Sequence, residues 1–332
     1  MKQVKFIIGL MAFGVVSLFA GCGEKENEMT KVTLNEVAHS IFYAPQYVAL
    51  ENGYFTQEGL DLDLVTGYGA DKTMAAVISG EAQIGFMGAE ASVYAYLEGA
   101  NDPVINFAQG TQRAGNFLVA REEMADFQWS DLKGKEVLGG RKGGMPEMVF
   151  EYILKENGLD PAKDLSIDQS IDFGSTAAAF SGGKGEFTVE FEPAATTLEK
   201  NGDGFVVASL GVDSGYVPYT SYSAKTSYVE KHPEIIQAFT DGLQKGVDYV
   251  NFHTAEEIAK VIQPQFKEND LDTITRIVER YQSQDTWKEN LVFEKESFEL
   301  LQDILESAGE LEKRADYEKL VTTIYAKEAM KK

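Results

Sequence analysis

The fold class is decided by residues 71–99, which read DKTMAAVISGEAQIGFMGAEASVYAYLEG. Apolar residues recur at helical spacing between Asp71, which suits an N-cap, and Gly80, which suits a C-cap. Residues 83–87 are short and apolar, as buried strands are, and residues 89–97 form a second helical pattern. Alternating helices and strands predict an α/β protein with mainly parallel sheets. The residues expected on the buried face of the first helix are Met74, Ala75, Val77 and Ile78.

Short apolar segments and glycine-terminated helical segments continue to alternate on both sides of this stretch. Further strands are expected at Val32–Glu36, Leu60–Val65, Val104–Gln109, Phe117–Ala120, Glu136–Leu138, Leu165–Gln169, Phe187–Phe191 and Phe205–Ser209. From Val229 onward the strand pattern stops, and the sequence predicts long amphipathic helices. These helices are expected near Pro233–Asn251, Ala255–Ile262, Leu271–Gln284, Lys295–Ser307 and Tyr317–Ala326.

The first 21 residues have the features of an export signal. Lys2 and Lys5 precede an apolar run of about 14 residues, shorter than the roughly 20 that a membrane-spanning helix needs. Phe19-Ala20-Gly21-Cys22 resembles a bacterial lipobox, although leucine is usual where Phe19 stands; a plain secretory signal with an incidental cysteine is the alternative. The resemblance implies that Cys22 carries a lipid and that residues 22–30 form a polar tether. No other cysteine is present, so an intrachain disulfide is impossible.

Composition and charge narrow the function further. Without the 21-residue signal, the 332-residue chain would be near the size at which one core divides into two lobes. The formal net charge is −23, and loss of Lys2 and Lys5 with the signal makes it −25. Such acidity argues against nucleic acid or an anionic membrane as partner of the folded surface. The three histidines, His39, His232 and His253, are far apart, so we expect no metal site, no cofactor and no catalytic cluster.

Four phrases occur in order along the chain: NGYFTQEGLD at 52–61, ISGEAQIG at 78–85, DLKGK at 131–135 and EFEP at 190–193. Together they resemble the substrate-binding proteins of nitrate, sulfonate, taurine and thiamine-precursor importers, the SsuA/THI5-like or NMT1-like family. The resemblance implies a periplasmic-binding-protein fold of the second type, with two lobes, a hinge and a central cleft. Lobe 1 would comprise residues 31–120 and 213–332, including the helical C-terminal region, and lobe 2 residues 121–212.

Candidate ligand-binding residues in the first half follow the expected strands, because open sheets bind ligands beyond the carboxyl ends of their strands. Phe42 and Tyr43 lie in the loop after the first strand, although such aromatic residues could instead cap the core. Glycines on both sides of Tyr68 let the backbone approach a ligand closely, but a plain turn looks the same. Glu90 begins a helix, where a carboxylate is stabilised by about 0.3–1 kcal/mol without any ligand. The candidates of this half are His39, Phe42, Tyr43, Tyr68, Met87 and Glu90.

In the second half, Gly143 and Gly144 precede a predicted helix, a geometry that suits an anion bound by backbone N–H groups. Sulfonate-binding members of that family commonly have Ser or Thr there, so the glycines of this chain weaken the case for a sulfonate ligand. Glu190 and Glu192 share a strand face and would favour a cationic ligand, or else form a solvated rim. Tyrosines near the second crossing suit a heteroaromatic ring or a quaternary nitrogen, with strand packing as the alternative. The candidates of this half are Gly143, Gly144, Met145, Ser175, Glu190, Glu192, Tyr216 and Tyr219.

These features predict an extracytoplasmic, lipid-anchored solute-binding protein that delivers a small organic molecule to the permease and ATPase subunits of an ABC importer. The favoured ligand is thiamine, its pyrimidine precursor or a similar heteroaromatic amine, and an alkyl sulfonate or taurine is the alternative. A ligand-sensing lipoprotein would show the same features. The rival from another class is an enzyme, because eukaryotic THI5-like pyrimidine synthases share the implied fold. We expect no enzyme, since such chemistry would need a metal-binding or nucleophilic cluster.

Overall fold

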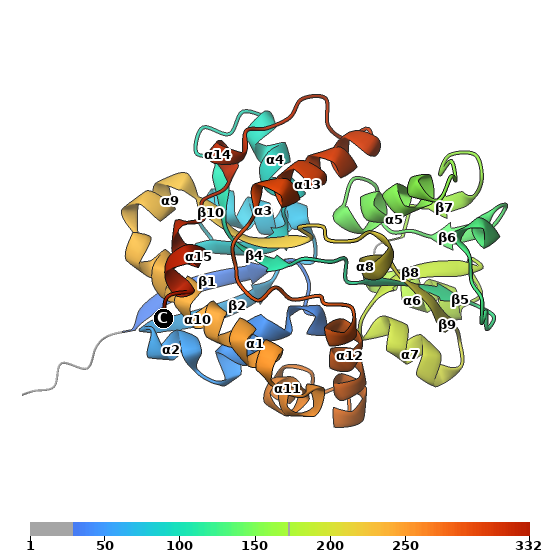
Figure 1. Cartoon of the computed structure of the whole chain (residues 1–332), viewed down its shortest axis with the longest axis horizontal. Helices are drawn as coiled ribbons and strands as arrows, with labels where there is room; N and C mark the ends of the chain where they lie inside the picture. Colours follow the sequence, from blue (N-terminus) through green and yellow to red (C-terminus); the bar gives the residue numbers. More distant parts are fainter. Residues whose placement is uncertain (1–28, 172) are drawn as a thin grey trace, which may run out of the picture.

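The computed structural model describes residues 29–171 and 173–332 and consists of two lobes, each built on a five-stranded sheet covered by helices (Figure 1). The strand orders are β2-β1-β3-β10-β4 and β7-β6-β8-β5-β9. The predicted α/β class is confirmed. The predicted export signal, Cys22 and nearly all of the predicted tether lie outside the described residues, and the first strand begins at Thr30.

The first sheet is parallel except at one strand. β1 (Thr30–Glu36) pairs in parallel with β2 (Leu60–Thr66) and with β3 (Ile84–Gly88). β10 (Thr220–Lys225) is antiparallel to both β3 and β4 (Val104–Thr111), so a late segment of the chain lies inside the sheet. The helices that accompany these strands are η1 (Ile41–Tyr43), α1 (Ala44–Glu51), α2 (Tyr54–Gln57), α3 (Ala70–Ser79) and α4 (Glu90–Leu97).

The second sheet is also mixed. β6 (Glu136–Leu138) pairs in parallel with β7 (Ser166–Asp168) and β8 (Phe187–Phe191). β5 (Asn116–Ala120) runs antiparallel between β8 and β9 (Phe205–Ser209). The helices of this lobe are η2 (Trp129–Leu132), α5 (Met145–Glu156), α6 (Phe173–Ser181), α7 (Ala194–Asn201) and α8 (Leu210–Asp213).

The first crossing between the sheets differs from the predicted one. The expected boundary near Ala120 placed residues 116–120 in the first lobe, whereas β5 forms its hydrogen-bond ladders within the second sheet. The chain therefore crosses between Thr111 and Asn116. An apolar strand such as Phe117–Ala120 fits either sheet, so its pairing partner could not be read from its own residues.

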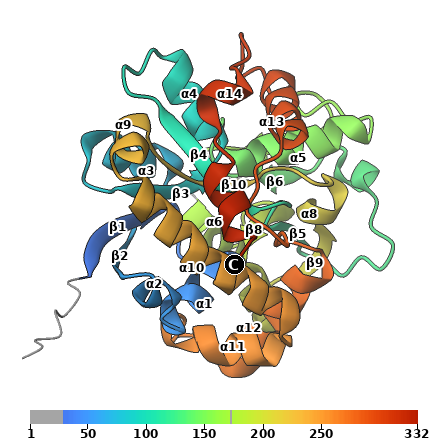
Figure 2. The same ribbon diagram turned by 60° about the vertical axis from the view of Figure 1, so that its left-hand side comes forward.

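The C-terminal region is helical, as predicted, and surrounds the first lobe (Figure 2). Its long helix α10 (Pro233–Phe252) packs on α1 and α15. The helix predicted at 317–326 is divided, because Val321 leaves the helical path to form a parallel bridge with Asn106 of β4. The other elements of this region are α9 (Thr226–Lys231), α11 (Ala255–Ile262), η3 (Gln263–Gln265), α12 (Leu271–Ser283), α13 (Lys295–Ser307), α14 (Tyr317–Leu320) and α15 (Ile324–Ala329).

One large cluster of buried apolar residues extends through both lobes, and a smaller one lies between α3, β3 and α4. The buried face of α3 differs from the predicted face. Gly69 is the N-cap and Asp71 lies in the first turn, while Ala75 is exposed and Ile78 is 48% exposed. No helix in the described ranges is long and apolar enough to cross a membrane. The residues that α3 buries are Thr73, Met74, Ala76 and Val77.

Candidate functional site

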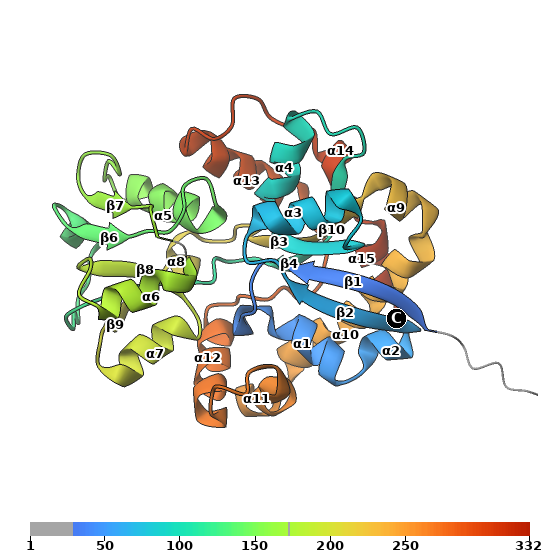
Figure 3. The same ribbon diagram turned by 180° about the vertical axis from the view of Figure 1, so that it is seen from behind.

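The two lobes meet where the chain passes twice between the sheets, from β4 to β5 and from α8 to β10 (Figure 1, Figure 3). The loop after β1 lies at the same junction. Its Ser40 donates a hydrogen bond from Oγ to the backbone oxygen of Glu192 in the second lobe, 2.9 Å away. The carboxyl ends of β1 and β8 therefore approach each other, which is where open α/β sheets bind ligands.

Four aromatic side chains gather at this junction. Phe42 and Tyr43 belong to η1, Phe191 ends β8, and Tyr219 directly precedes β10. The ring centroid of Phe42 lies 5.3 Å from that of Tyr43, 6.2 Å from that of Phe191 and 5.7 Å from that of Tyr219. Three candidates taken from the sequence, Phe42, Tyr43 and Tyr219, are thus neighbours and buried.

Glu90 is the buried acid of the junction. It is the first residue of α4 and is only 3% exposed. Burial raises the pKa of its carboxyl group to about 7, while backbone N–H groups of Glu90 itself and of Met145 in the second lobe pull that pKa down. Its Oε2 atom has no hydrogen-bond partner in the described part of the chain. Burial is the main cause of the raised pKa values of Tyr43 and Tyr219, and the charge of Glu90 adds a smaller contribution to each.

The start of α5 faces Glu90 from the second lobe. Gly144 is the N-cap of α5, and the N–H of the next residue, Met145, interacts with the Glu90 carboxylate. The hydroxyl group of Tyr94 on α4 donates to the carbonyl oxygen of Gly143, 3.3 Å away. The sequence indicated that this helix N-terminus has a geometry suited to an anion. In the structure, a carboxylate of the protein itself contacts it.

Asn116 supplies a polar group at the first crossing. It is fully buried, and its Oδ1 atom accepts a hydrogen bond of 2.5 Å from the hydroxyl group of Tyr219. That bond leaves the amide nitrogen Nδ2 pointing away from Tyr219, and Nδ2 has no partner among the described residues. Among the described residues, the junction therefore offers an unpaired acceptor on Glu90 and an unpaired donor on Asn116, next to aromatic rings, and Nε of Arg113 in the same crossing also lacks a partner.

Glu190 and Glu192 are both buried but have different surroundings. Glu190 accepts a hydrogen bond of 2.6 Å from Thr188, and burial raises the pKa of its carboxyl group to about 7. Glu192 forms an ion pair with Arg280 on α12, with 2.5 Å between Nη1 and Oε1, and accepts two hydrogen bonds from Thr196. Glu192 therefore already has a counter-charge, whereas Glu190 has neutral partners in these contacts.

His39 is occupied within the first lobe. Its Nδ1 lies 2.8 Å from a carboxylate oxygen of Glu36, and its Nε2 lies 2.9 Å from the carbonyl oxygen of Gln265. The ring also stacks on Phe266. Because both ring nitrogens have partners, His39 supports the loop that carries Ser40 and Phe42, and its contacts leave no free nitrogen for a ligand.

Four other candidates lie away from this group. Met87 belongs to the small cluster under α3, on the sheet face opposite to Phe86. Tyr68 is 74% exposed, and Ser175 is an exposed residue inside α6. Tyr216 is 53% exposed, with its hydroxyl group on Asp285 and the Arg113 guanidinium 4.1 Å from its ring centroid.

Two further residues matter at the junction. Asn116 begins an otherwise apolar strand, NFLVA. A single polar residue in such a buried strand indicates a functional or structural role, and the sequence alone shows it. Arg280 has no such signal, because its place on an amphipathic helix looks like that of an ordinary surface residue. Its contacts at the junction come from Glu192, 88 positions away in the chain, and from Glu199, 81 positions away.

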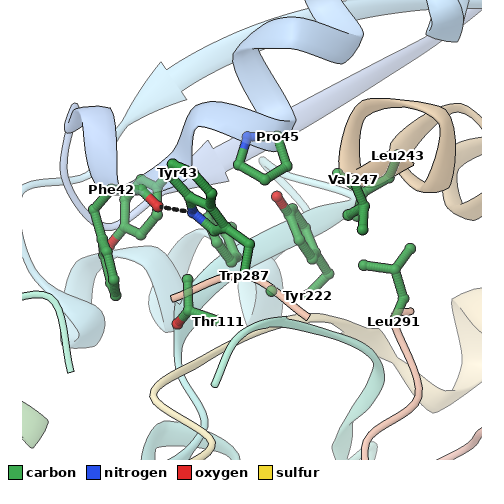
Figure 4. Close-up of a pocket in the computed structure, with 11 residues that line it drawn as sticks. Phe42, Tyr43, Pro45, Thr111, Tyr222, Leu243, Val247, Trp287 and Leu291 are labelled. Carbon is green, nitrogen blue, oxygen red and sulfur yellow. Dashed lines mark hydrogen bonds between the residues drawn. The ribbon is translucent and has the colours of Figure 1, made fainter. Parts of the chain in front are cut away.

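The aromatic wall of the junction has little free space behind it. A cavity of about 10 Å³ lies beneath Tyr43, at the lower limit for one water molecule (Figure 4). The indole N–H of Trp287 donates to the carbonyl oxygen of Phe42, 2.9 Å away, and holds η1 over this cavity. The lining residues include Pro45, Phe86, Thr111, Tyr222, Leu243 and Leu291. The rings of Phe42 and Tyr43 are therefore closely packed against the residues behind them.

Comparison with known proteins places the chain in a family. The NMT1/THI5 like family model matches residues 41–257, which include the second lobe, both crossings and part of the first lobe. A protein of Bacillus subtilis (strain 168), named "Putative binding protein YtlA", is 45% identical over 317 residues, covering 95% of both chains.

Solved structures share the fold at low sequence identity. The alkanesulfonate-binding protein SsuA from Xanthomonas axonopodis pv. citri, bound to MOPS, has a TM-score of 0.72 and 16% identity, with 89% of this chain and 99% of that chain covered. The nitrate-binding protein NrtA from Synechocystis PCC 6803 has a TM-score of 0.71 and 15% identity, covering 92% of this chain and 89% of that chain. These likenesses confirm the expected two-lobed periplasmic-binding-protein fold. The chain belongs to the NMT1/THI5-like family, as the order of its four sequence phrases indicated.

Proposed function

We propose that this protein is the lipid-anchored solute-binding protein of an ABC importer and that its ligand is a small cationic or amine-bearing heteroaromatic molecule, thiamine or its pyrimidine precursor being the favoured case. Its family and the name of its 45% identical relative support binding without catalysis. The observation that carries the ligand class is the buried carboxylate of Glu90, which has an unpaired oxygen at the junction of the lobes.

A cation is the partner that this carboxylate lacks. Removing a carboxylate from water is costly unless an opposite charge or several hydrogen bonds replace the water. Burial holds the pKa of Glu90 near 7, so a bound cation would complete the ion pair and favour the charged form. Aromatic faces from Phe42, Tyr43 and Tyr219 would attract the same cation and stack on a flat ring.

An alkyl sulfonate is the second candidate, since SsuA of Xanthomonas axonopodis binds an alkanesulfonate. A sulfonate would use the N–H groups at the start of α5. In this chain it would meet the like charge of Glu90 at that position, so the geometry favours the cation.

Calorimetric titration of the purified protein with thiamine, formylaminopyrimidine, riboflavin and taurine tests the ligand class. We expect heat from thiamine or the pyrimidine and none from taurine. Glu90→Gln should weaken that binding by about tenfold or more, because one charge pair is lost. Glu98→Gln removes an exposed carboxylate from the end of the same helix and should leave binding unchanged. Binding of taurine alone would overturn the proposed ligand class.

The membrane anchor is tested separately. We propose that Cys22 is lipidated and that the permease and ATPase subunits of an importer are the partners. Cells expressing the protein should incorporate labelled palmitate into it, and Cys22→Ser should abolish this label and release the protein from the membrane fraction. A membrane-bound, unlabelled wild-type protein would contradict the lipid anchor.

A further inference from the structure

α12 reaches from the first lobe to the second. The helix packs on α11 and on η1, which belong to the first lobe, and it lies below the junction in the view of Figure 3. Arg280, in its last turn, crosses to the second lobe. Its Nη1 atom is 2.5 Å from Oε1 of Glu192, and its Nη2 atom is 2.8 Å from Oε2 of Glu199 on α7.

We propose that Arg280 is a closure latch: it holds the two lobes together from outside the ligand site and thereby sets how fast a bound molecule leaves. Arg280 acts as a positioning residue, because it works through Glu192. The consequence for ligand release rests on the proposed solute-binding function, whereas the consequence for lobe closure does not.

Burial makes this ion pair different from the surrounding surface pairs. The side chain of Arg280 is 19% exposed and that of Glu192 is 0% exposed. Two further ion pairs join α7 to α12 or its N-cap. Lys200 pairs with Asp270, and their side chains are 40% and 66% exposed, while Arg276 pairs with Glu199 but is itself 53% exposed. Exposed pairs contribute little and are screened by salt, whereas breaking a buried pair leaves a charge without a partner.

Glu192 connects Arg280 to the candidate site. It directly follows Phe191, whose ring belongs to the aromatic group, and its backbone oxygen accepts the hydrogen bond from Ser40. Release of Glu192 from Arg280 would therefore loosen the end of β8 and the loop after β1 together.

The neighbouring residue strengthens the same connection. The hydroxyl group of Tyr281 donates to the carbonyl oxygen of Gly115 in the first crossing, 3.0 Å away. The Tyr281 ring centroid lies 5.3 Å from that of Phe42. The last turn of α12 thus contacts the crossing segment, the second lobe and η1 at once, which is the set of parts that must move when two lobes open around a hinge.

Small-angle scattering of the purified protein without ligand tests the latch. Arg280→Met should increase the radius of gyration relative to the wild type, because the closed arrangement loses its buried pair. Arg280→Lys, which keeps the charge but loses the fork that reaches both carboxylates, should lie in between. Lys200→Met removes one of the exposed pairs of the same interface and should scatter like the wild type.

Ligand release gives the second measurement. With thiamine as the probe, Arg280→Met should accelerate dissociation on the order of tens of times in stopped-flow experiments, since truncating one partner of a buried charge pair acts mainly on the dissociation rate. If thiamine does not bind, the ligand proposal fails while the scattering result still decides the latch.

The double variant Arg280→Met/Glu192→Gln guards against simple misfolding, because it leaves neither a buried arginine nor a buried carboxylate unpaired. It should fold and should still scatter as the more open form. A radius of gyration equal to that of the wild type, in both the single and the double variant, would overturn the latch.

Discussion

The Oε2 atom of Glu90 lies only 2.1 Å from the position that a β-carbon on Gly88 would occupy. The carboxylate therefore rests directly over the backbone of Gly88 and needs the absence of a side chain there. Gly88→Ala should push the carboxylate out of this position. The side chain of Glu90 is flexible, so it can move without disrupting β3. We expect thiamine affinity to fall as far as in Glu90→Gln, with little change in the melting temperature.

A combination of variants isolates this cause. In the Glu90→Gln background, the added Gly88→Ala substitution should not weaken calorimetric binding further, because the group that it displaces has already lost its charge. Full additivity of the two effects would show that Gly88 acts independently of Glu90.

The stability of the unliganded protein should fall as pH rises from about 4 to 8. Glu90 and Glu190 have pKa values of about 7 in the folded protein, and Glu147 of about 8, chiefly because of burial. An unfolded glutamate has a pKa of about 4.3, so the folded state holds more protons than the unfolded state within this window. Each group contributes stability that is complete below about pH 4.3 and is lost as pH rises through its folded pKa. For Glu90 the loss is roughly 4 kcal/mol at most.

Urea unfolding at a series of pH values measures this effect. The difference in unfolding free energy between the wild type and Glu90→Gln should decrease from pH 4.5 to pH 7.5. Thiamine affinity should follow the opposite course and rise toward pH 7, because the ionised carboxylate binds the cation. A pH-independent difference between the two proteins would mean that Glu90 titrates in its ordinary range.

Glu36 should be essential to the stability of the first lobe. Its buried carboxylate lies 2.8 Å from each of three side-chain groups, on His39, Gln46 and Tyr47, and 3.1 Å from the hydroxyl group of Thr66. Glu36→Gln replaces one acceptor oxygen by a donor that faces other donors. We expect a loss of about 2–4 kcal/mol in the free energy of unfolding, measured with urea.

The contribution of His39 gives this loss a pH dependence. The hydrogen bond with Glu36 raises the pKa of His39, so its share of the stability is complete below the unfolded value of about 6.5 and is lost as pH rises through the folded pKa. Glu51→Gln, an exposed carboxylate on α1 that accepts a hydrogen bond from Gln265, serves as the control and should change stability little. Equal effects of both variants would contradict a special role for Glu36.

Apolar periodicity predicted most strands and helices, and the strand that it missed shows its limit. β10 has the sequence TSYSAK and buries polar side chains. The hydroxyl groups of Thr220 and Ser221 are buried because they pair with Thr111 and Asn106 of β4, at 2.7 and 2.5 Å. Because the buried side chains of β10 are polar, its sequence shows no apolar alternation. Their hydrogen-bond partners lie far away in the chain, so the strand could not be recognised from its own residues.

A residue's place at the junction could be inferred from the sequence where its own segment determines that place. Glu90 and Tyr43 follow the ends of strands, and the fold brings such positions together. Glu192 could not be interpreted from its own segment, because its environment depends on Arg280, far along the chain. Met87 and Phe86 are adjacent, and only the neighbouring strands decide which of them faces the junction.

The position of β10 constrains the order in which the protein can be assembled. Its residues are synthesised after the whole second lobe, yet they separate β3 from β4 in the first sheet. The N-terminal half therefore emerges from the ribosome as an unfinished sheet with unpaired strand edges, which are prone to association with other chains. The lipid anchor proposed above requires export, and a chain of this topology would then benefit from being kept unfolded until residue 225 has crossed the membrane.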